Sequence, residues 1–422
     1  MASASVNGSS KAVNAASEFP ANQHQDFWKE YSTRPLAAFL KHTGVYTPEQ
    51  QESHLKFLHD VVVPRIGVSP DVKSLWTYHG SPFEFSVNLT DAEDPFVRFV
   101  FDPVGGDIGD GVTEPLPQDA LLTVIPGLAE ATRADMRWFY QIKEWLFLKK
   151  EEVMAVRKEW SAHPRVPQIF FAVDLHGEGR SLKAYMFPAS KSTATGRSSV
   201  DIVMENVRRL EPYGDSLVPA LDALEAYFPT SLEPLEVDCM AIDCVEPSQA
   251  RVKIYAQAKL NTIKSVEHVV TYGGAYKNDI TDKTMAAVRK IWPLILNDPH
   301  VADSDEHQAA PVDPESRYKT LSYSWEVRPG QAMPDLKIYI HLWLHARDNK
   351  TMLGKWEEIF RVNGWQWGGK GAYKNMIADA FGDEYLTADT EVIHTCASFQ
   401  YTEKKGVYMT SYMSKPVPKV DA

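Results

Sequence analysis

The segment that decides the fold lies at residues 336–344 and reads Leu-Lys-Ile-Tyr-Ile-His-Leu-Trp-Leu. Successive side chains of a β-strand point to opposite faces, so the leucines and isoleucines of this segment share one face. The other face carries Lys337, Tyr339, His341 and Trp343. The segment therefore predicts a strand with one apolar face and one basic, aromatic face.

The same alternation recurs along the chain. Basic and tyrosine side chains share a face at 181–187 and 250–257, and tyrosines share a face at 406–413. Each of these strands is the second of a pair, and helical stretches precede each pair, so we predict five helix-helix-strand-strand units. The predicted strands are 83–89, 96–101, 168–175, 181–187, 235–242, 250–257, 319–326, 336–344, 391–400 and 406–413. The predicted helices are 27–40, 48–65, 118–128, 133–158, 199–210, 215–227, 263–272, 281–296, 350–362 and 370–381.

The strand face that does not pack on helices must either be exposed to solvent or be enclosed within the fold. An open sheet would expose it to water, where mixed charges and threonine are usual, but here the second strands are basic and rich in tyrosine. A closed barrel removes the sheet edges and encloses this face as a lumen. We predict an α+β fold in which ten antiparallel strands form a closed barrel inside a ring of helices. An open sheet is the alternative.

Length and composition indicate the class of protein. The chain has 422 residues, 44% of them hydrophobic, with 56 acidic and 44 basic side chains, which is typical of a globular protein with a sizeable core. A net charge of −12 argues against nucleic acid as a partner, because a phosphate backbone requires a broad basic surface. No apolar run has the length of a membrane span, and three cysteines are too few for a disulfide framework. We therefore expect a cytoplasmic protein.

The predicted units account for nearly all of the chain as one domain. Residues 1–21 are rich in serine, alanine and asparagine and poor in large side chains, which predicts a disordered leader. We expect the barrel domain at 22–415 and a tail at 416–422.

Five bases converge in the predicted lumen. Isolated buried cations are costly, so such a cluster indicates a compensating anion. A diphosphate fits, because arginine can grip its oxygens in forks and lysine acts as a point charge. Tyrosine hydroxyls can donate to the same oxygens, and tyrosine rings can stabilise a nearby cation. The alternative is that the bases face outward in ordinary ion pairs. The bases are Arg98, Lys183, Arg251, Lys253 and Lys337, and the tyrosines are Tyr185, Tyr255, Tyr339, Tyr408 and Tyr412.

Glu84 shares a strand face with Ser86 and Asn88. A glutamate inside a basic, aromatic lumen can accept an N–H or O–H from an aromatic substrate and draw off its proton. The alternative is an internal ion pair with a lumen base such as Arg98.

Two motifs that suggest other chemistry are set aside. Asn278, Asp279 and Asp282 resemble an aspartate-rich magnesium box, but they stand at a helix start, where such residues are favoured as caps. The glycine-rich stretch 104–111 lacks the spacing of a phosphate-binding loop. No histidine spacing or serine elbow indicates a metal site or a nucleophilic serine, so no metal is predicted.

Six short motifs follow one another in order between about residues 70 and 415. They are Ser81-Pro82-Phe83-Glu84-Phe85-Ser86, Arg98-Phe99 with Pro103, Lys183-Ala184-Tyr185 ending in Phe187-Pro188, the 243–255 segment with its Arg-Val-Lys-Ile-Tyr, Lys337-Ile338-Tyr339, and Gly406-Val407-Tyr408-Met409-Thr410-Ser411-Tyr412. Together they resemble the fungal aromatic (indole) prenyltransferases of the dimethylallyltryptophan synthase type.

That resemblance implies the prenyltransferase (ABBA) barrel. It also implies metal-independent transfer of a dimethylallyl or longer prenyl group from its diphosphate to an electron-rich aromatic acceptor in secondary metabolism. No cofactor is implied beyond the co-substrate dimethylallyl diphosphate, and Mg²⁺ is not essential. Glu84, which would orient the acceptor, and Lys183 would be catalytic. The five bases would hold the diphosphate, and the five tyrosines would shield the allyl cation. Acceptor contacts are expected at His79, Phe187, Met240 and Trp343.

Departures from the family pattern bear on the acceptor. Tryptophan C4 enzymes of this family carry a further lysine upstream of the Lys183 position, whereas here the residues around Phe170 include no base. Enzymes that take free tryptophan place an arginine for its carboxylate on the next strand, which here carries Glu236 and Asp238 instead. Cys396 stands where a tyrosine is common. We therefore expect an uncharged acceptor such as a tryptophan-containing cyclic dipeptide, an indole alkaloid or a phenol. The small residues Thr320, Ser322 and Ser324 leave space for a prenyl chain longer than dimethylallyl.

Two alternatives to an indole prenyltransferase stay open. One is a phenol- or polyketide-directed enzyme in which His79 or Glu84 deprotonates a hydroxyl. The other is a non-catalytic barrel that binds isoprenyl diphosphates. In every case we expect small-molecule partners, no nucleic acid and no membrane, and a monomer or homodimer.

Overall fold

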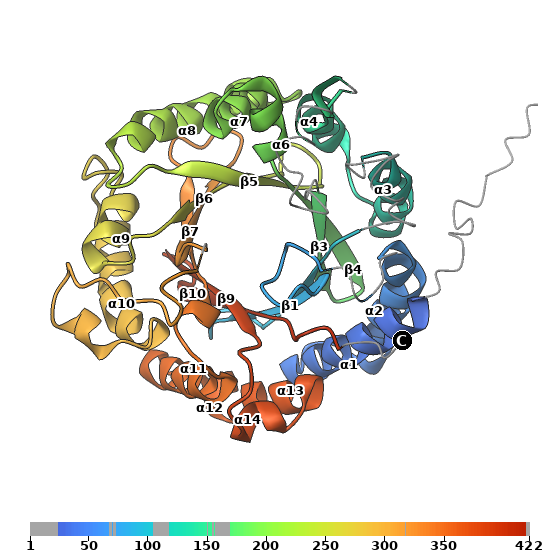
Figure 1. Cartoon of the computed structure of the whole chain (residues 1–422), viewed down its shortest axis with the longest axis vertical. Helices are drawn as coiled ribbons and strands as arrows, with labels where there is room; N and C mark the ends of the chain where they lie inside the picture. The colour runs from blue at the N-terminus through green and yellow to red at the C-terminus, as the bar shows by residue number, and fades with distance from the viewer. Residues whose placement is uncertain are drawn as a thin grey trace, which may run out of the picture.

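Ten strands among the described residues close into one barrel, which helices surround as a ring (Figure 1). The computed structural model describes residues 24–66, 70, 73–103, 118–149, 151–153, 156, 169–316 and 318–418. Neighbouring strands pair antiparallel in the order β1-β10-β9-β8-β7-β6-β5-β4-β3-β2. The pairing of β1 with β10 closes the ring. The predicted closed barrel is confirmed, and the open sheet is not formed.

The strands lie close to their predicted positions. They are β1 (Phe83–Leu89), β2 (Val97–Phe101), β3 (Ile169–His176), β4 (Gly179–Met186), β5 (Glu236–Asp243), β6 (Val252–Ala258), β7 (Leu321–Val327), β8 (Asp335–Ile340), β9 (His394–Thr402) and β10 (Gly406–Met413). The main difference is at β8, which was predicted to continue to residue 344. The backbone N–H of His341 donates to the carbonyl of Thr320, and the chain then enters a 3₁₀ turn, η5 (Leu342–Leu344).

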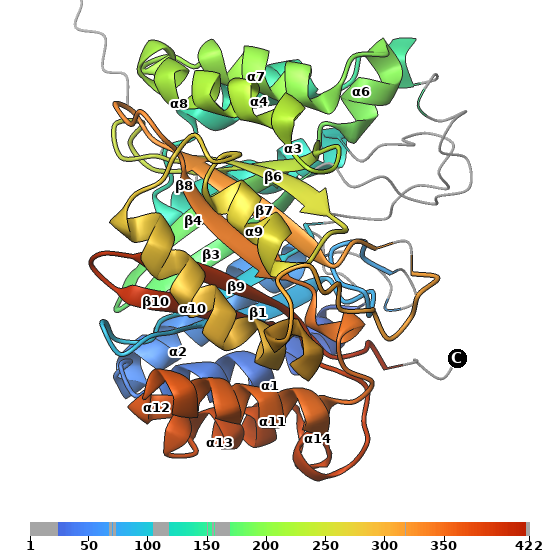
Figure 2. The same ribbon diagram turned by 90° about the vertical axis from the view of Figure 1, so that its left-hand side faces the viewer.

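Helices cover the outside of the barrel, and in side view they lie above, below and beside the inclined strands (Figure 2). Their bounds confirm most predictions. The predicted helix 133–158 is interrupted, because α4 ends at Leu146 and residues 151–153 and 156 are helical again. Three short helices, α6, α12 and α14, were not predicted. The helices are α1 (Gln25–Thr43), α2 (Pro48–Phe57) continued by η1 (Leu58–Val62) and η2 (Val63–Arg65), α3 (Gln118–Thr132), α4 (Arg137–Leu146), α6 (Ala189–Thr195), α7 (Ser199–Arg208), α8 (Gly214–Tyr227) with η3 (Phe228–Thr230), α9 (Ile263–Val270), α10 (Asp279–Ile295) with η4 (Pro299–Ala302), α11 (Asn349–Asn363), α12 (Gln366–Gly369), α13 (Ala372–Phe381) and α14 (Glu384–Thr387).

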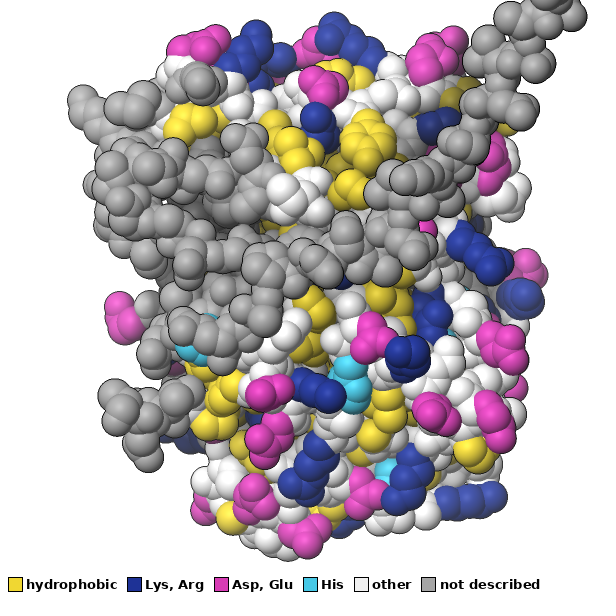
Figure 3. Space-filling model, turned by 90° about the vertical axis from the view of Figure 1, so that its right-hand side faces the viewer, with side chains coloured by type: hydrophobic (Ala, Val, Ile, Leu, Met, Phe, Trp, Pro, Cys, Tyr) yellow, Lys and Arg dark blue, Asp and Glu magenta, His cyan; other side chains and the backbone are white. Residues whose placement is uncertain are grey.

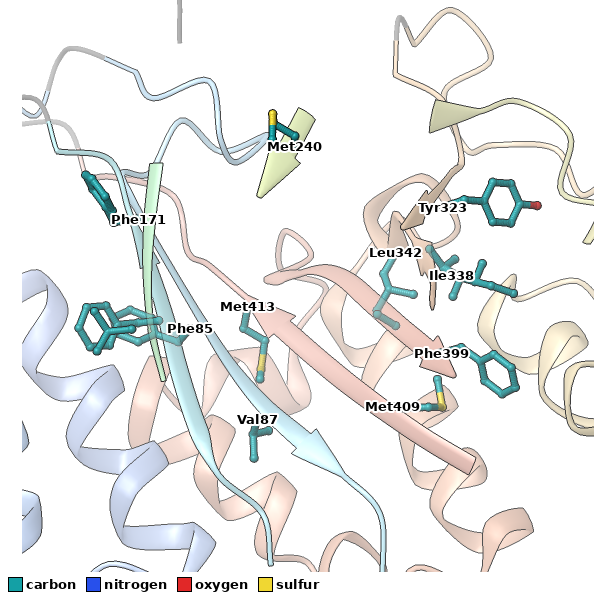
Figure 4. Close-up of a cluster of buried hydrophobic side chains, with 14 of the residues drawn as sticks. Phe85, Val87, Phe171, Met240, Tyr323, Ile338, Leu342, Phe399, Met409 and Met413 are labelled. Carbon is teal, nitrogen blue, oxygen red and sulfur yellow. The ribbon is translucent and has the colours of Figure 1, made fainter. Parts of the chain in front are cut away.

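Side chains on the outward face of the strands form the main core against the helices (Figure 4). Phe85 and Val87 of β1 and Met409 and Met413 of β10 lie on this face and are almost completely buried. Burying one such side chain stabilises the fold by about 1.5–3 kcal/mol. A register shift of one residue would exchange this face with the polar face, so the core fixes which side chains point into the lumen.

Two helix starts carry the caps that the sequence indicates. Thr47 and Gln50 form a capping box at the start of α2. The side-chain oxygen of Asn278 accepts the backbone N–H groups of Ile280 and Thr281, each at 3.0 Å, at the start of α10. The prediction that the Asn278 segment caps a helix is therefore confirmed.

Acidic and basic side chains are interspersed on the outer surface, as the face in Figure 3 shows. No helix among the described residues is both long and apolar enough to cross a membrane. The last described segment returns to α1, where the hydroxyl of Tyr31 donates to the backbone oxygen of Lys415 at 2.6 Å. The predicted leader at 1–21 and the glycine-rich stretch 104–111 lie outside the described residues.

Candidate functional site

The inward-facing side chains form successive layers along the barrel axis. On β4, β6 and β8 a lysine is followed two residues later by a tyrosine, and two residues beyond it by Phe187, Gln257 or His341. Alternate residues of a strand share a face, so the three strands repeat one vertical order of base, tyrosine and polar or aromatic side chain. The lumen therefore has a basic layer, a tyrosine layer and a layer around a cavity. The three lysine–tyrosine pairs are Lys183 with Tyr185, Lys253 with Tyr255, and Lys337 with Tyr339.

The basic layer also contains three buried carboxylates that the sequence analysis missed. Asp174 pairs with Arg98, whose Nη2 lies 3.1 Å from Oδ2, and with Lys183. These carboxylates lie on the first strand of each pair, and register places them beside bases of the second strands. The prediction of a basic face concerned the second strands, and the acids that compensate it come from the first strands. The three are Asp174, Asp243 and Glu326.

Asp243 and Glu326 complete the network. Asp243 accepts from Arg251 Nε at 2.5 Å and from Lys253 Nζ at 2.9 Å. Glu326 accepts from Arg251 Nη1 at 2.8 Å, and Lys337 Nζ lies 3.7 Å from its other oxygen. Five lumen bases thus face three carboxylates, a formal excess of two positive charges when every group is ionised, and the half-exposed Arg328 lies 3.6 Å from Glu326. The lumen is cationic but partly compensated.

The electrostatics of the cluster follow from burial and charge. Burial alone would raise the pKa of Glu326, but Lys337 and Arg251 lower it to about 2. Burial, together with Arg251, lowers the pKa of Lys253 to about 7. An added anion in this layer would therefore stabilise the protonated form of Lys253.

A row of four tyrosines separates the basic layer from the cavity. Ring centroids lie 6.1 Å apart for Tyr185 and Tyr255, 5.7 Å for Tyr255 and Tyr339, and 5.9 Å for Tyr339 and Tyr412. On one side of each tyrosine the register partner is small: the four partners are Ala241, Ser324, Ser398 and Ser86. The partner of Tyr185 on its other side is the large Phe170.

Tyr408 occupies a different level from the other tyrosines. It lies four residues from Tyr412 on β10, beside the bases, with Lys337 Nζ 5.3 Å and Lys405 Nζ 4.5 Å from its ring centroid. It is buried but does not line the cavity. Its position favours contact with an anion rather than with an allyl group.

Beyond the tyrosines lies a cavity of about 230 Å³. Glu84, Phe187 and Trp343 line it, as do all four tyrosines of the row. The described wall also holds Asp238 and His341, and four side chains for which no role was predicted: Trp76, Tyr78, Gln257 and Thr395. Lysine and arginine are absent from this described wall, so the cavity and the cationic cluster are separate compartments of one lumen.

Glu84 accepts two side-chain hydrogen bonds, whereas Asp238, the other carboxylate that lines the described cavity wall, accepts one. Oε2 of Glu84 accepts the indole N–H of Trp76 at 3.0 Å, and its Oε1 accepts the hydroxyl of Thr395 at 2.5 Å. Burial raises the pKa of Glu84 to about 7, although both hydrogen bonds act in the opposite direction. The alternative ion pair with Arg98 is not formed, because Arg98 pairs with Asp174.

Met240 does not reach the cavity, so the expected acceptor contact there is wrong. The pairing of β5 with β6 shifts between Val237 and Cys239, which is a β-bulge at Asp238. Asp238 and Cys239 both line the cavity, and the next residue, Met240, points outward into the main core (Figure 4). Strict alternation had placed Met240 on the lumen face, and the extra residue of the bulge reverses it.

His79 also lies outside the cavity, which corrects a second expected acceptor contact. Its Nε2 bonds the backbone oxygen of Val392 at 2.8 Å, and its ring stands behind Tyr78, with centroids 3.7 Å apart. Tyr78 in turn stacks on Trp343 at 4.6 Å. Burial lowers the pKa of His79 to about 4, so the ring is neutral and structural.

No sequence pattern marks Trp76, because it lies in a loop before β1, where side chains have no periodicity. Asp238 and His341 were visible as inward-facing polar residues, but only the bulge and the cavity assign them a place. Glu236, at the start of β5, is exposed. No cluster of three or more histidine, cysteine or acidic side chains suited to a metal ion occurs among the described residues.

Comparison with known proteins agrees with this geometry. A family model described as tryptophan dimethylallyltransferase matches residues 24–376. The indole diterpene prenyltransferase terF of Tolypocladium album is 33% identical, over 93% of this chain and 93% of that protein. The indole prenyltransferase tdiB of Emericella nidulans is 30% identical, over 93% and 96%. The crystal structure of NotF prenyltransferase superimposes with a TM-score of 0.79 at 22% identity, covering 94% of this chain and 96% of that one, and so shares the fold.

Proposed function

Because this chain belongs to the tryptophan dimethylallyltransferase family, we propose that its lumen joins a prenyl group to an indole acceptor. The chain is a prenyltransferase. The donor we propose is dimethylallyl diphosphate, with its diphosphate in the basic layer and its allyl group at the tyrosine row. The acceptor would occupy the cavity beside Glu84.

The basic layer supports the diphosphate assignment. Its five cations exceed its carboxylates by two, and they are fixed in place by ion pairs before any ligand arrives. Preorganised cations stabilise negative charge that develops on a leaving group without the cost of reorienting water. We propose that Arg98, Lys183, Arg251, Lys253 and Lys337 hold the diphosphate as its C–O bond ionises. Lys183 is then catalytic because it stabilises the departing oxygen.

The tyrosine row supports an allyl cation on the cavity side of the diphosphate. Rings of Tyr185, Tyr255, Tyr339 and Tyr412 present their π-systems along one level of the lumen. Aromatic faces attract a cation, and a wall of rings keeps water from capturing it. Carbon attack by the acceptor ring would follow, and loss of a proton would restore aromaticity.

The observation that carries the indole proposal is the hydrogen bond between Trp76 and Glu84. The protein holds its own indole N–H on this carboxylate at 3.0 Å, within a wall that contains the tyrosine row. A carboxylate that accepts an indole N–H stabilises the positive charge that develops on the ring during attack, and so makes the ring a better nucleophile. We propose that the acceptor indole makes the same contact when bound.

Chain length and cellular setting remain proposals. Ser322 lines the cavity and is small, which supports space for a prenyl group longer than dimethylallyl. Cys239, Cys244 and Cys396 are free thiols, which supports a reducing, cytoplasmic location. We propose a monomer or homodimer, and sizing by light scattering tests this.

The decisive experiment incubates the full chain with dimethylallyl diphosphate, a panel of indoles and phenols, and excess EDTA. We expect a prenylated indole, with the metal-independent reaction unaffected by the chelator. Exclusive turnover of phenols would replace the acceptor proposal, and loss of activity on chelation would overturn the metal-free mechanism. Tight binding of the diphosphate without turnover of any aromatic compound would refute the proposed reaction.

A further inference from the structure

Asp238 lines the cavity, and one of its carboxylate oxygens has no hydrogen-bond partner within the described structure. Its Oδ2 accepts from the side-chain amide of Gln257 at 2.6 Å, whereas its Oδ1 is buried and has no hydrogen bond within the described structure. The bulge of β5 is what turns this side chain inward. A buried polar atom without a partner costs about 1–3 kcal/mol, and a ligand that satisfies it recovers this cost.

No neighbouring group in the described structure forms a hydrogen bond with Oδ1 of Asp238. The nearby ammonium of Lys319 lies 3.4 Å from the backbone oxygen of Gln257, and no ion pair joins it to Asp238 among the described residues. One of the two amide N–H groups of Gln257 donates to Oδ2, and its side-chain oxygen is an acceptor. The missing partner of Oδ1 is a donor, and no group of the described structure is placed to donate to it.

His341 adds a further hydrogen-bond acceptor to the same wall. Its Nδ1 lies 2.6 Å from the backbone oxygen of Lys319. A carbonyl oxygen only accepts, so Nδ1 carries the proton and Nε2 is an acceptor, 3.4 Å from the hydroxyl of Ser322. Because the described cavity wall has no lysine or arginine, nothing there would pair with a carboxylate of a ligand.

We propose that Asp238 binds an amine or amide N–H on the side chain of the indole acceptor, and that this contact selects the acceptor. The inference rests on the proposed function and extends it to a second contact. The ring N–H binds Glu84, the side-chain N–H binds Asp238, and an acceptor that bears a free carboxylate is disfavoured. The acceptor class is therefore an indole with a donor, and without an anion, on its side chain.

The test compares acceptors that differ only in this side chain, at saturating dimethylallyl diphosphate. Tryptamine and N-acetyltryptamine carry a cationic and a neutral N–H donor, 3-ethylindole carries none, and tryptophan adds a carboxylate. For the unmodified enzyme we expect KM values for the two donors at least about tenfold below those for 3-ethylindole and tryptophan. Equal values across the series would overturn the inference.

Substitutions assign the effect to one residue. Asp238→Asn should raise KM for tryptamine about tenfold and leave KM for 3-ethylindole and for dimethylallyl diphosphate unchanged. Glu236→Gln removes the same charge from the exposed face of the same strand and should change nothing. A uniform rise for all acceptors would show a structural role and refute the proposal.

The design separates this inference from the proposed function. Turnover of 3-ethylindole and tryptamine with equal KM would leave the prenyltransferase reaction intact and refute the role of Asp238. If no acceptor is turned over, calorimetric titration of tryptamine and 3-ethylindole into the enzyme still measures the donor preference. Tryptamine binding no tighter than 3-ethylindole would then count against Asp238.

Discussion

The indole N–H of Trp76 donates to Oε2 of Glu84 at 3.0 Å, so one side chain of the protein occupies a carboxylate oxygen at the acceptor cavity. The second oxygen is taken by Thr395. Trp76 also contacts the ring of Tyr185, with centroids 5.4 Å apart, and thus bridges Glu84 and the tyrosine row. An acceptor that binds Glu84 must share this carboxylate with Trp76 or displace it.

Replacement of Glu84 by glutamine should slow prenyl transfer about 100-fold while the affinity for dimethylallyl diphosphate stays within about twofold. Glutamine keeps the size but loses the charge that draws on the acceptor N–H. Steady-state kinetics with an indole acceptor and calorimetric titration of an unreactive diphosphate analogue measure the two effects. A parallel loss of both would show that Glu84 supports the lumen as a whole.

The rate of transfer should fall in acid. Burial raises the pKa of Glu84 to about 7, and only the ionised carboxylate accepts hydrogen bonds on both oxygens. Lowering the pH through 7 protonates it, so kcat/KM for the acceptor should drop about tenfold between pH 8 and pH 6. A pH profile measured in parallel on Glu84→Gln should lack this step. A profile that is flat in the unmodified enzyme would contradict the prediction.

Replacement of Trp76 by phenylalanine should move this step to higher pH. The hydrogen bond from Trp76 lowers the pKa of Glu84, and its removal leaves burial less opposed. Trp343→Phe is the matched control, because Trp343 lines the same cavity and Glu84 takes its two hydrogen bonds from Trp76 and Thr395. The acid limb of kcat/KM locates the pKa in each variant. An equal shift in the two would attribute it to lost ring volume.

Replacement of Asp174 by asparagine should destabilise the free enzyme by about 3 kcal/mol, since it leaves Arg98 without its carboxylate and Lys183 with only Asp243, at 3.7 Å. Inorganic pyrophosphate should then stabilise the variant more than it stabilises the unmodified enzyme, because the anion replaces the missing charge. Thermal unfolding with and without pyrophosphate measures both effects. Asp60→Asn, which breaks an exposed pair with Lys56, should show neither. An equal pyrophosphate effect in all three proteins would place the anion elsewhere.

The sequence predicts the barrel and its bases well because alternation is regular on β4, β6 and β8. Along each of these strands a lysine, a tyrosine and a third inward side chain follow at intervals of two, so one strand suffices to read the layers. Phe187 reaches the cavity for this reason, whereas Trp343 reaches it from the 3₁₀ turn η5, beyond the end of β8. No knowledge of partner strands is needed for these residues.

The remaining features depend on relationships that a linear pattern does not contain. Asp174 meets Arg98 only through the register of β2 with β3. The bulge at Asp238 reverses Met240, and nothing in the local sequence marks the extra residue. Trp76 and His79 stand in a loop, where no period relates side chains to a face.

The hydrogen bond from Thr395 to Glu84 joins residues 311 positions apart in the chain. During synthesis at about 5 to 20 residues per second, Glu84 therefore waits roughly 15 to 60 s before its partner leaves the ribosome. The closing strand β10 emerges later still, and until it pairs with β1 both edges of the sheet are unpaired. A nascent chain thus holds all of the lumen's bases before it has a closed lumen, and the enzyme acquires its site only as the final strands fold.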